Sequence, residues 1–378
     1  MRKGWEIKEL DTICEINYGT RVVNKRDGGT IYPVYGGGGA TFNMDTYNRE
    51  DCFIVPRFAM SKQCTRFVSG KFFLNDSGLS VTPKNQNELL QDFLDMQLLY
   101  LNDYIYSLSK GSAQKNLDVP AFRKTKITFP KSISEQQEIV SILDDAFESI
   151  ERAKSNAEQN LKNAKELFES YLQNIFENKG QDWEETTLGE IGKVSMCKRV
   201  LKNQTTREGD IPFYKIGTFG KKPDSFISNE LYNEFRSKYP FPKKGDILIS
   251  ASGTIGRSVI YDDKPAYFQD SNIVWISNNN EVILNEYLFE FYGYCNWNPS
   301  KGATISRLYN DDLRRIKISY PKSKENQRVI VQKINELSEK IKRLESIYHQ
   351  KLNDLEELKK SILQKAFNGE LKTSKISA

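Results

Sequence analysis

The sequence predicts an α+β protein in which two globular domains of mixed helices and strands are joined by two long helices. Two observations carry this prediction: the second half of the 378-residue chain repeats the plan of the first, and each copy ends in a long stretch without proline or glycine. Short runs of β-branched and aromatic residues elsewhere in each copy indicate strands. We expect the long helices to pair within the chain as an antiparallel coiled coil with pseudo-twofold symmetry.

The internal repeat has two matching parts. Each copy opens with the pattern W-x-x-x-x-L, at Trp5 and at Trp183, and residues 110–176 align with residues 301–367 without a gap. Matched pairs in this alignment include Lys110 and Lys301, Leu117 and Leu308, Pro130 and Pro321, Gln136 and Gln327, and Leu172 and Leu363. A gapless match of this length indicates duplication. It predicts domains at residues 1–131 and 181–322, with helical segments at residues 132–180 and 323–378.

Each long helix is expected to begin shortly after a proline, Pro130 or Pro321, because proline often marks a helix boundary. Ser134 and Gln137 form a candidate capping box for the first helix. Proline and glycine are then absent until Gly180 and Gly369. At about 1.5 Å per residue each helix would be roughly 60–70 Å long, a length typical of a coiled coil.

The apolar residues of both helices recur mainly at alternating spacings of three and four, which is the heptad pattern. They are Ile139, Leu143, Ala146, Ile150, Ala153, Ala157, Ala164, Phe168, Tyr171 and Ile175 in the first helix, and Ile330, Ile334, Leu337, Ile341, Leu344, Tyr348, Leu355 and Ile362 in the second. Four alanines of the first helix align with large residues of the second, so the two helices fill space better together than with themselves. The short link at residues 178–183 makes them antiparallel. The alternative is that each helix packs on its own domain.

The remaining elements are short. Predicted strands lie at residues 53–55, 78–82 and 126–129 in the first domain, and at residues 246–250, 257–261, 273–276 and 317–320 in the second. Short helices are expected at residues 87–101 and 285–294. The domains match at their ends and diverge between them, which suggests two modules that recognise different targets.

Composition excludes several functions. The net charge is only +5, the five cysteines form no CxxC pair, and His349 is the only histidine. Histidine-dependent hydrolysis and two-histidine metal sites are therefore not expected. No run of about 20 apolar residues suggests a membrane span, and no secretory signal is expected. The scattered cysteines suit a reducing cytoplasm.

Two loops of the first domain carry candidate nucleic-acid contacts. A glycine run at residues 36–39 could cradle a phosphate through backbone N–H groups, although it lacks the spacing of a P-loop. The turn at residues 55–63, with a following arginine, offers cations and an amide. The candidates are Tyr35, Gly37 and Gly38 in the first loop, and Arg57, Lys62, Gln63 and Arg66 in the second. An ordinary flexible turn is the alternative in both places.

The second domain has a comparable loop, and both domains share a repeated turn. Hydroxyls, glycines and an arginine at residues 250–257 suit contacts with phosphates or base edges. The repeated turn combines K-G with further cations, hydroxyls or amides, which suits a clamp on the DNA backbone. The candidates are Ser250, Ser252, Thr254 and Arg257 in the loop, and Lys110, Ser112, Gln114, Lys115, Lys301, Thr304, Ser306 and Arg307 in the repeated turns. Surface turns are again the alternative.

Motifs of autonomous catalysis are missing from the sequence. It contains no [DN]-P-P-[YF] methyltransferase tetrad and no Walker box. Pro223-Asp224 has no well-spaced E-x-K after it, as a nuclease site would require. We therefore expect no catalytic residue and no metal ligand in this chain.

The whole pattern resembles the specificity subunits of type I restriction–modification systems. The resemblance rests on the W-x-x-x-x-L openings, the K-G turns followed by a proline and a long helix, and the ending S-I-L-Q-K-A-F-N-G-E-L at residues 361–371. It covers essentially the whole chain. It implies that each globular domain is a target-recognition domain reading one half of a bipartite double-stranded DNA site, and that the helices set the spacer and dock two methyltransferase subunits. Motor–nuclease (restriction) subunits would then join the complex.

The resemblance also implies that the chain is not an enzyme. S-adenosylmethionine, ATP and Mg²⁺ would belong to the partner subunits. Alternatives remain: the recognition subunit of a related bifunctional enzyme that cuts on both sides of its site, a coiled-coil scaffold that does not bind DNA, or an autonomous enzyme. The repeated basic turns argue against the scaffold, and the missing motifs argue against the enzyme.

Overall fold

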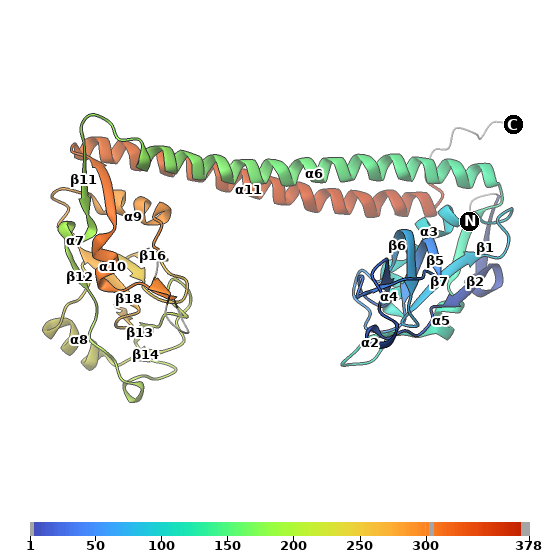
Figure 1. The fold of residues 1–378 in the computed structure, drawn as a ribbon, viewed down its shortest axis with the longest axis horizontal. Coiled ribbons are helices and arrows are strands. Elements are labelled where there is room, and N and C mark those ends of the chain that lie inside the picture. The colour runs from blue at the N-terminus through green and yellow to red at the C-terminus, as the bar shows by residue number, and fades with distance from the viewer. Residues whose placement is uncertain (1–3, 299, 302–305, 372–378) are drawn as a thin grey trace. The chain divides into compact units, whose positions relative to one another are not determined.

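The computed structural model describes residues 4–298, 300–301 and 306–371, and of Ser300, Lys301 and Ser306 it describes the backbone alone. The chain divides into two compact units. Unit 1 comprises Met1–Glu158 and His349–Ala378, and unit 2 comprises Gln159–Tyr348. Both long helices contribute residues to both units, because the division cuts each of them (Figure 1).

Unit 1 is built on a six-stranded sheet in the order β2-β7-β5-β6-β3-β4. Its strands are β2 (Cys14–Tyr18), β3 (Tyr32–Tyr35), β4 (Asn43–Met44), β5 (Arg49–Pro56), β6 (Arg66–Leu74) and β7 (Gly78–Pro83). Two smaller pairs are β1 (Trp5–Glu9) with β10 (Lys126–Pro130), and β8 (Ser109–Lys110) with β9 (Asn116–Leu117). The short helices are α1 (Leu10–Ile13), α2 (Asn24–Asp27), α3 (Gln91–Tyr100), α4 (Asn102–Ser107) and α5 (Val119–Arg123).

Unit 2 has a four-stranded sheet in the order β12-β18-β15-β16 and a three-stranded sheet in the order β14-β13-β17. Its strands are β11 (Trp183–Thr187), β12 (Lys193–Ser195), β13 (Ile211–Tyr214), β14 (Phe226–Ile227), β15 (Ile247–Ser250), β16 (Ser258–Ile260), β17 (Tyr267–Phe268), β18 (Ile273–Ser277), β19 (Ser300–Lys301), β20 (Ser306–Arg307) and β21 (Lys317–Pro321). Its short helices are α7 (Leu188–Ile191), η1 (Lys202–Gln204), α8 (Asn229–Lys238), α9 (Asn285–Tyr294) and α10 (Asn310–Arg315).

Pairing of the strands confirms the duplicated plan. β1 pairs with β10 so that Trp5 lies opposite Pro130, and β11 pairs with β21 so that Trp183 lies opposite Pro321. The W-x-x-x-x-L opening therefore lies beside the strand that leads into each long helix. In both units one parallel pair, β3 with β6 or β13 with β17, adds a small outer sheet to the antiparallel strands.

Most predicted elements are present, with corrected boundaries. Each predicted strand falls within or overlaps an observed one, and α9 has the predicted bounds. The prediction for residues 87–101 was wrong at its start, because α3 begins at Gln91. Asn85 closes a turn there by accepting a hydrogen bond at Oδ1 from the Asn87 backbone N–H over 3.0 Å. Asparagine favours such turns over a helix interior.

The long helices are α6 (Ile133–Glu177) and α11 (Lys324–Phe367), and both follow their prolines as predicted. The predicted capping box at Ser134 was wrong, because Ser134 already lies inside α6. The cap is Ser132, whose Oγ accepts a hydrogen bond from the Glu135 backbone N–H over 3.3 Å. Ser323 does the same for Asn326 over 3.4 Å, so the duplicated P-K-S segment supplies both caps.

A repeated glutamine fixes the first turn of each long helix to its globular domain. Gln136 is fully buried; its amide donates to the carbonyls of Glu88 and Pro130, and its Oε1 accepts from the Leu90 backbone N–H over 2.8 Å. Gln327 makes the equivalent bonds to Val282, Pro321 and Leu284. Because buried polar groups require partners, each glutamine ties α6 or α11 to the start of α3 or α9.

The other end of each long helix packs into the globular core of the other copy. Phe176, at the end of α6, packs on Tyr287 and stacks on Tyr294 in unit 2, with centroids 5.6 and 5.2 Å apart. Phe367, at the end of α11, packs on Phe93 and stacks on Tyr100 in unit 1, at 5.4 and 5.3 Å. The units are therefore completed reciprocally, since each contains the first part of one long helix and the last part of the other.

The two long helices pair antiparallel within each unit. In unit 1, Lys154 of α6 bonds to Glu356 of α11, while the earlier Glu151 lies 3.6 Å from the later Lys359. In unit 2, Lys165 lies 3.5 Å from Glu345. All predicted seam residues are buried or half-buried except Leu344, which is 38% exposed. The adjacent Glu345 is half-buried and makes the cross-helix ion pair, so Leu344 is turned away from the seam.

Candidate nucleic-acid interface

The repeated K-G turn is a hairpin that joins the loop after a central strand in both units. In unit 1 the Leu117 backbone N–H donates to the carbonyl of Arg57 over 2.8 Å, directly after β5. In unit 2 the equivalent Leu308 donates to Ala251 over 2.9 Å, directly after β15. The structure thus brings together loops that the sequence analysis selected separately.

In unit 1, Arg57 is held between two partly exposed aromatic rings. Its guanidinium carbon lies 4.7 Å from the Tyr18 ring centroid and 4.6 Å from that of Phe58. Its Nη1 donates to the carbonyl of Asp76 over 2.9 Å. Such stacking orients a guanidinium while leaving other N–H donors available for a ligand.

The hairpin of unit 1 presents polar groups to solvent. Ser112, Gln114 and Lys115 are exposed, and the carbonyl of Lys115 accepts from the Met60 backbone N–H over 2.8 Å. Lys110 lies 2.6 Å from Asp118, and this hydrogen bond lowers the pKa of the Asp118 carboxyl. Lys110 is thus partly neutralised, whereas Lys115 is an exposed cation on the turn.

The glycine run serves close packing at its first half. The Gly37 backbone N–H donates to Ser77 Oγ over 3.2 Å, and a Cβ on Gly37 would lie 2.3 Å from the carbonyl oxygen of Phe58. A Cβ on Gly38 would meet nothing within 4 Å. The preceding Tyr35 packs edge-on against Phe72. Gly37 therefore allows a close approach of two loops, while Gly38 is open to a ligand.

The remaining candidates of unit 1 lie elsewhere. Arg66 is the first residue of β6, and with Gln63 it lines a separate pocket of about 630 Å³ that also includes Tyr100, Lys154 and Glu356. Lys62 is exposed, and its carbonyl accepts from Asn102 over 2.7 Å. The structure does not place Gln63 and Arg66 with the groups around Arg57.

In unit 2 the loop at residues 250–257 is braced from within. Ser250 is 2% exposed, and its Oγ accepts from the Arg257 backbone N–H over 2.9 Å. Its hydroxyl donates to the carbonyl of Thr254. Arg257 donates to the carbonyl of Phe219 over 2.9 Å, and Thr254 is exposed. Ser250 thus shapes the loop and does not face solvent.

The hairpin of unit 2 pairs Lys301 with Ser306 in its backbone, and Thr304 lies outside the described residues. Arg307 forms an isolated bridge with Ser252, and its Nη2 donates to the carbonyl of Ser271 over 2.8 Å. Its guanidinium also lies 5.9 Å from the ring of Tyr309. Arg307 therefore sits where the hairpin, the loop and the residues before β18 meet.

Arg307 borders a groove of about 570 Å³ that sequence analysis missed. Four cations and one carboxylate line it, together with amides and hydroxyls. The charged lining residues are Arg199, Lys202, Lys215, Arg307 and Asp270. A strong excess of positive charge in a polar groove suits a phosphate backbone.

A repeated tripeptide forms the floor of this region in both units. Asn75-Asp76-Ser77 and Gln269-Asp270-Ser271 each follow the outer parallel strand pair, and the first residue donates its backbone N–H to Tyr35 or Tyr214. The signal in the sequence was F-L-N-D-S against Y-F-Q-D-S. It was missed because it lies in the divergent middle of the two domains.

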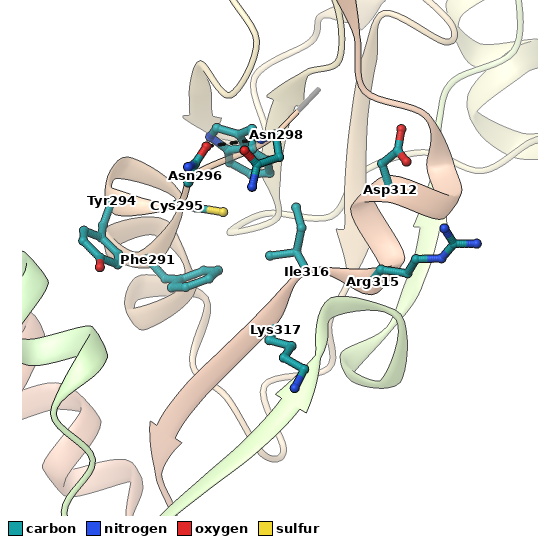
Figure 2. Close-up of a pocket in the computed structure, with 10 residues that line it drawn as sticks. Phe291, Tyr294, Cys295, Asn296, Asn298, Asp312, Arg315, Ile316 and Lys317 are labelled. Carbon is teal, nitrogen blue, oxygen red and sulfur yellow. Dashed lines mark hydrogen bonds between the residues drawn. The ribbon is translucent and has the colours of Figure 1, made fainter. Parts of the chain in front are cut away.

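A second pocket in unit 2, of about 460 Å³, has different chemistry (Figure 2). Phe291, Tyr294 and Cys295 line it from the end of α9, and Arg315 and Lys317 line it from the other side. Lys317 pairs with Glu185 over 3.0 Å. Burial raises the pKa of the Cys295 thiol to about 12, so the thiol stays protonated and is a poor nucleophile.

Two searches gave negative results for the parts of the chain that the structure describes. Among those residues, no group of three or more His, Cys, Asp or Glu side chains could hold a metal ion. Nor does any helix there have the length and apolar character needed to cross a membrane.

Two α+β units that share a tryptophan-led strand pair, a glutamine-anchored long helix and a hairpin beside a polar loop define a duplicated recognition-type protein. The family model for the type I restriction modification DNA specificity domain matches residues 2–160 and 180–357. The chain belongs to this family of type I restriction–modification specificity subunits.

Relatives and solved structures agree with this assignment. A type I restriction enzyme specificity subunit assigned in Haemophilus influenzae is 40% identical over 336 residues, covering 86% of each chain. A chain from a type I restriction–modification system, solved to explain complex assembly and conformational transition, has a TM-score of 0.77 at 17% identity and covers 98% of this chain and 99% of its own. An HsdS subunit from Thermoanaerobacter tengcongensis has a TM-score of 0.59 at 17% identity, with 98% of both chains covered. The structural likenesses support the predicted fold.

Proposed function

We propose that this chain is the DNA-binding, non-catalytic specificity subunit of a type I restriction–modification complex. Each globular domain, at residues 1–131 and 181–322, reads one half of a bipartite target in double-stranded DNA. The observation that carries the proposal is the repeated junction of hairpin and loop, where Leu117 bonds to Arg57 and Leu308 bonds to Ala251. Both junctions are surrounded by cations, amides and hydroxyls, the groups that contact phosphates and base edges.

The two long helices would set the spacer between the half-sites and dock two methyltransferase subunits. Their support is the reciprocal completion of the units, because α6 and α11 each end in a core aromatic cluster. Helices fixed at both ends transmit a defined length, and two fixed readers contact half-sites at a defined separation. Motor–nuclease subunits would complete the complex in the cytoplasm, and S-adenosylmethionine, ATP and Mg²⁺ would be bound by the partner subunits.

The test is to assemble the chain with its methyltransferase subunits and select bound fragments from a random DNA library. We expect one bipartite sequence with a fixed spacer. Exchanging residues 1–131 for the equivalent domain of a relative should change one half-site and leave the other. A complex that binds DNA without sequence preference would refute the proposal, and so would a chain that methylates or cuts DNA alone.

A further inference from the structure

The repeated D-S floor carries an inference that rests on the proposed function and goes to single residues. The N-D-S segment of unit 1 leads directly into β7 at Gly78, whereas the Q-D-S segment of unit 2 is followed by one extra residue, Asn272, before β18. Ser271 takes a φ of 59°, a left-handed conformation that accommodates the insertion. Asn272 lines the basic groove.

Asn272 is held in place from three directions. Its backbone N–H donates to the carbonyl of Asp270 over 2.7 Å, and its carbonyl accepts from the Ala251 N–H over 2.8 Å. Its side-chain Oδ1 accepts from the hydroxyl of Ser252 over 2.7 Å. No described residue accepts a hydrogen bond from its Nδ2, so an oriented amide donor remains at the groove. A side chain fixed by such supporting bonds is preorganised for recognition.

Arg307 supplies a second oriented donor beside it. One guanidinium nitrogen is committed to the carbonyl of Ser271, which leaves the other N–H groups for a ligand. Arginine donors pair with guanine O6 and N7, and an amide N–H₂ donates to acceptors on purine or thymine edges. The other cations of the groove, Arg199, Lys202 and Lys215, surround these two donors.

We propose that Asn272 and Arg307 contact base edges in the half-site bound by unit 2, while Arg199, Lys202 and Lys215 hold its phosphates. Ser252 is then a positioning residue that orients the Asn272 amide. The division follows from chemistry, because the two residues fixed by neighbouring bonds offer directional donors. The lysines offer mobile point charges, which suit sequence-independent contacts.

The experiment is selection from a randomised library by the full complex with its methyltransferase subunits, for four variants. Asn272→Ala should reduce discrimination at one base position of one half-site by roughly tenfold, and Arg307→Lys should do so at a neighbouring position. Ser252→Ala should relax the Asn272 position more weakly. Lys202→Ala should lower affinity alike for all sequences and reduce the slope of log affinity against log salt by about 0.9.

Lys244→Ala is the matched control, since this exposed lysine of unit 2 is not part of the groove. It should leave the selected sequence unchanged. If the wild-type complex selects a bipartite site but both Asn272→Ala and Arg307→Lys select the same site with full discrimination, the inference is overturned and the proposed function stands. If the wild-type complex selects no sequence, the proposed function itself fails. A base preference lost only in Lys202→Ala would reverse the assigned roles.

Discussion

The outer sheets of the two units show how one plan has been modified. In unit 1, β6 runs unbroken from Arg66 to Leu74, pairing with β5 and then with β3. In unit 2 the corresponding stretch is divided into β16 and β17 by residues that include Pro265. Proline cannot donate to a strand ladder, so it favours such a break. Unit 2 also inserts α8 between β14 and β15.

The cores differ in the same place. Unit 2 has a second apolar cluster with Tyr267, Phe268 and Trp275 at its centre, whereas the matching cluster of unit 1 is smaller and includes Phe72 and Leu74. By contrast, the parts that hold the long helices match residue by residue, as Gln136 and Gln327 show. The comparison teaches that the helix-holding part is kept constant while the outer part, which bears the candidate DNA contacts, diverges.

An arginine beside the D-S floor makes this point at one position. In unit 1 it is Arg57, from the loop after β5, bonded to the Asp76 carbonyl. In unit 2 it is Arg307, from the hairpin, bonded to the Ser271 carbonyl. At the exchanged places stand Ala251 and Asn116. A similar guanidinium contact is therefore supplied by different elements, which gives the two units different donor directions.

The largest expected effect tests the reciprocal completion of the units. Phe176→Ala should destabilise unit 2 and Phe367→Ala should destabilise unit 1, each by about 3–5 kcal/mol, because a buried aromatic ring is lost from a cluster. Hydrogen exchange resolved by peptide would show which unit opens. Leu167→Ala is the control, since Leu167 is 62% exposed on the same helix. Equal destabilisation of both units by either phenylalanine variant would contradict reciprocal completion.

What the sequence could predict follows the same division. The long helices, their antiparallel pairing and the tryptophan-led strands were predictable, because heptad spacing and a gapless repeat are local or self-evident signals. The groove of unit 2 was not, because Arg199, Lys215 and Asn272 come from separate loops and are brought together by the parallel pairing of β13 with β17. Ser250 looked like a contact residue because hydroxyls serve both to bind ligands and to brace loops.

A middle-sized effect should appear in unit 1 as a pH dependence. Asp95 of α3 is buried where α9 has Phe289, and burial raises the pKa of this carboxyl to about 7. The unfolded value is about 3.9, so the folded state binds the proton more tightly and stability falls as pH rises from about 4 to about 7. Above pH 7 the full cost applies, on the order of 3 kcal/mol.

Asp95→Asn should remove this cost. The variant should stabilise unit 1 at pH 8 by on the order of 2–3 kcal/mol and have little effect at pH 4, measured by hydrogen exchange at both values. The amide can keep the bond to Gln91, whose Nε2 donates to Asp95 Oδ1 over 2.6 Å. Unit 2, where burial also raises the pKa of Asp246 and Glu290, serves as an internal control and should keep its own dependence. A gain of the same size at pH 4 would show that the charge of Asp95 is not the cause.

The smallest effect concerns how the long helices select each other. The ion pair of Lys154 with Glu356 in unit 1 corresponds in the repeat to that of Glu345 with Lys165 in unit 2, so the charges are exchanged between the helices. Both lysines lie on α6 and both glutamates on α11. If α6 paired antiparallel with a second copy of α6 in the equivalent register, Lys154 would face Lys165, and two copies of α11 would bring Glu345 to Glu356. Charge therefore adds to side-chain size in favouring α6 with α11.

The variant Lys165→Glu with Glu345→Lys separates the two contributions. Both ion pairs remain within the chain, so the free energy of unfolding should change by less than about 0.5 kcal/mol. Each helix now carries one lysine and one glutamate at the facing positions, so pairing with its own copy no longer meets repulsion, and the dimer fraction should rise. Sedimentation velocity after refolding at several concentrations measures this. Lys154→Glu with Glu356→Lys should behave alike, because it exchanges the other pair. An unchanged dimer fraction in both variants would assign the selectivity to the alanine and leucine packing of the seam alone.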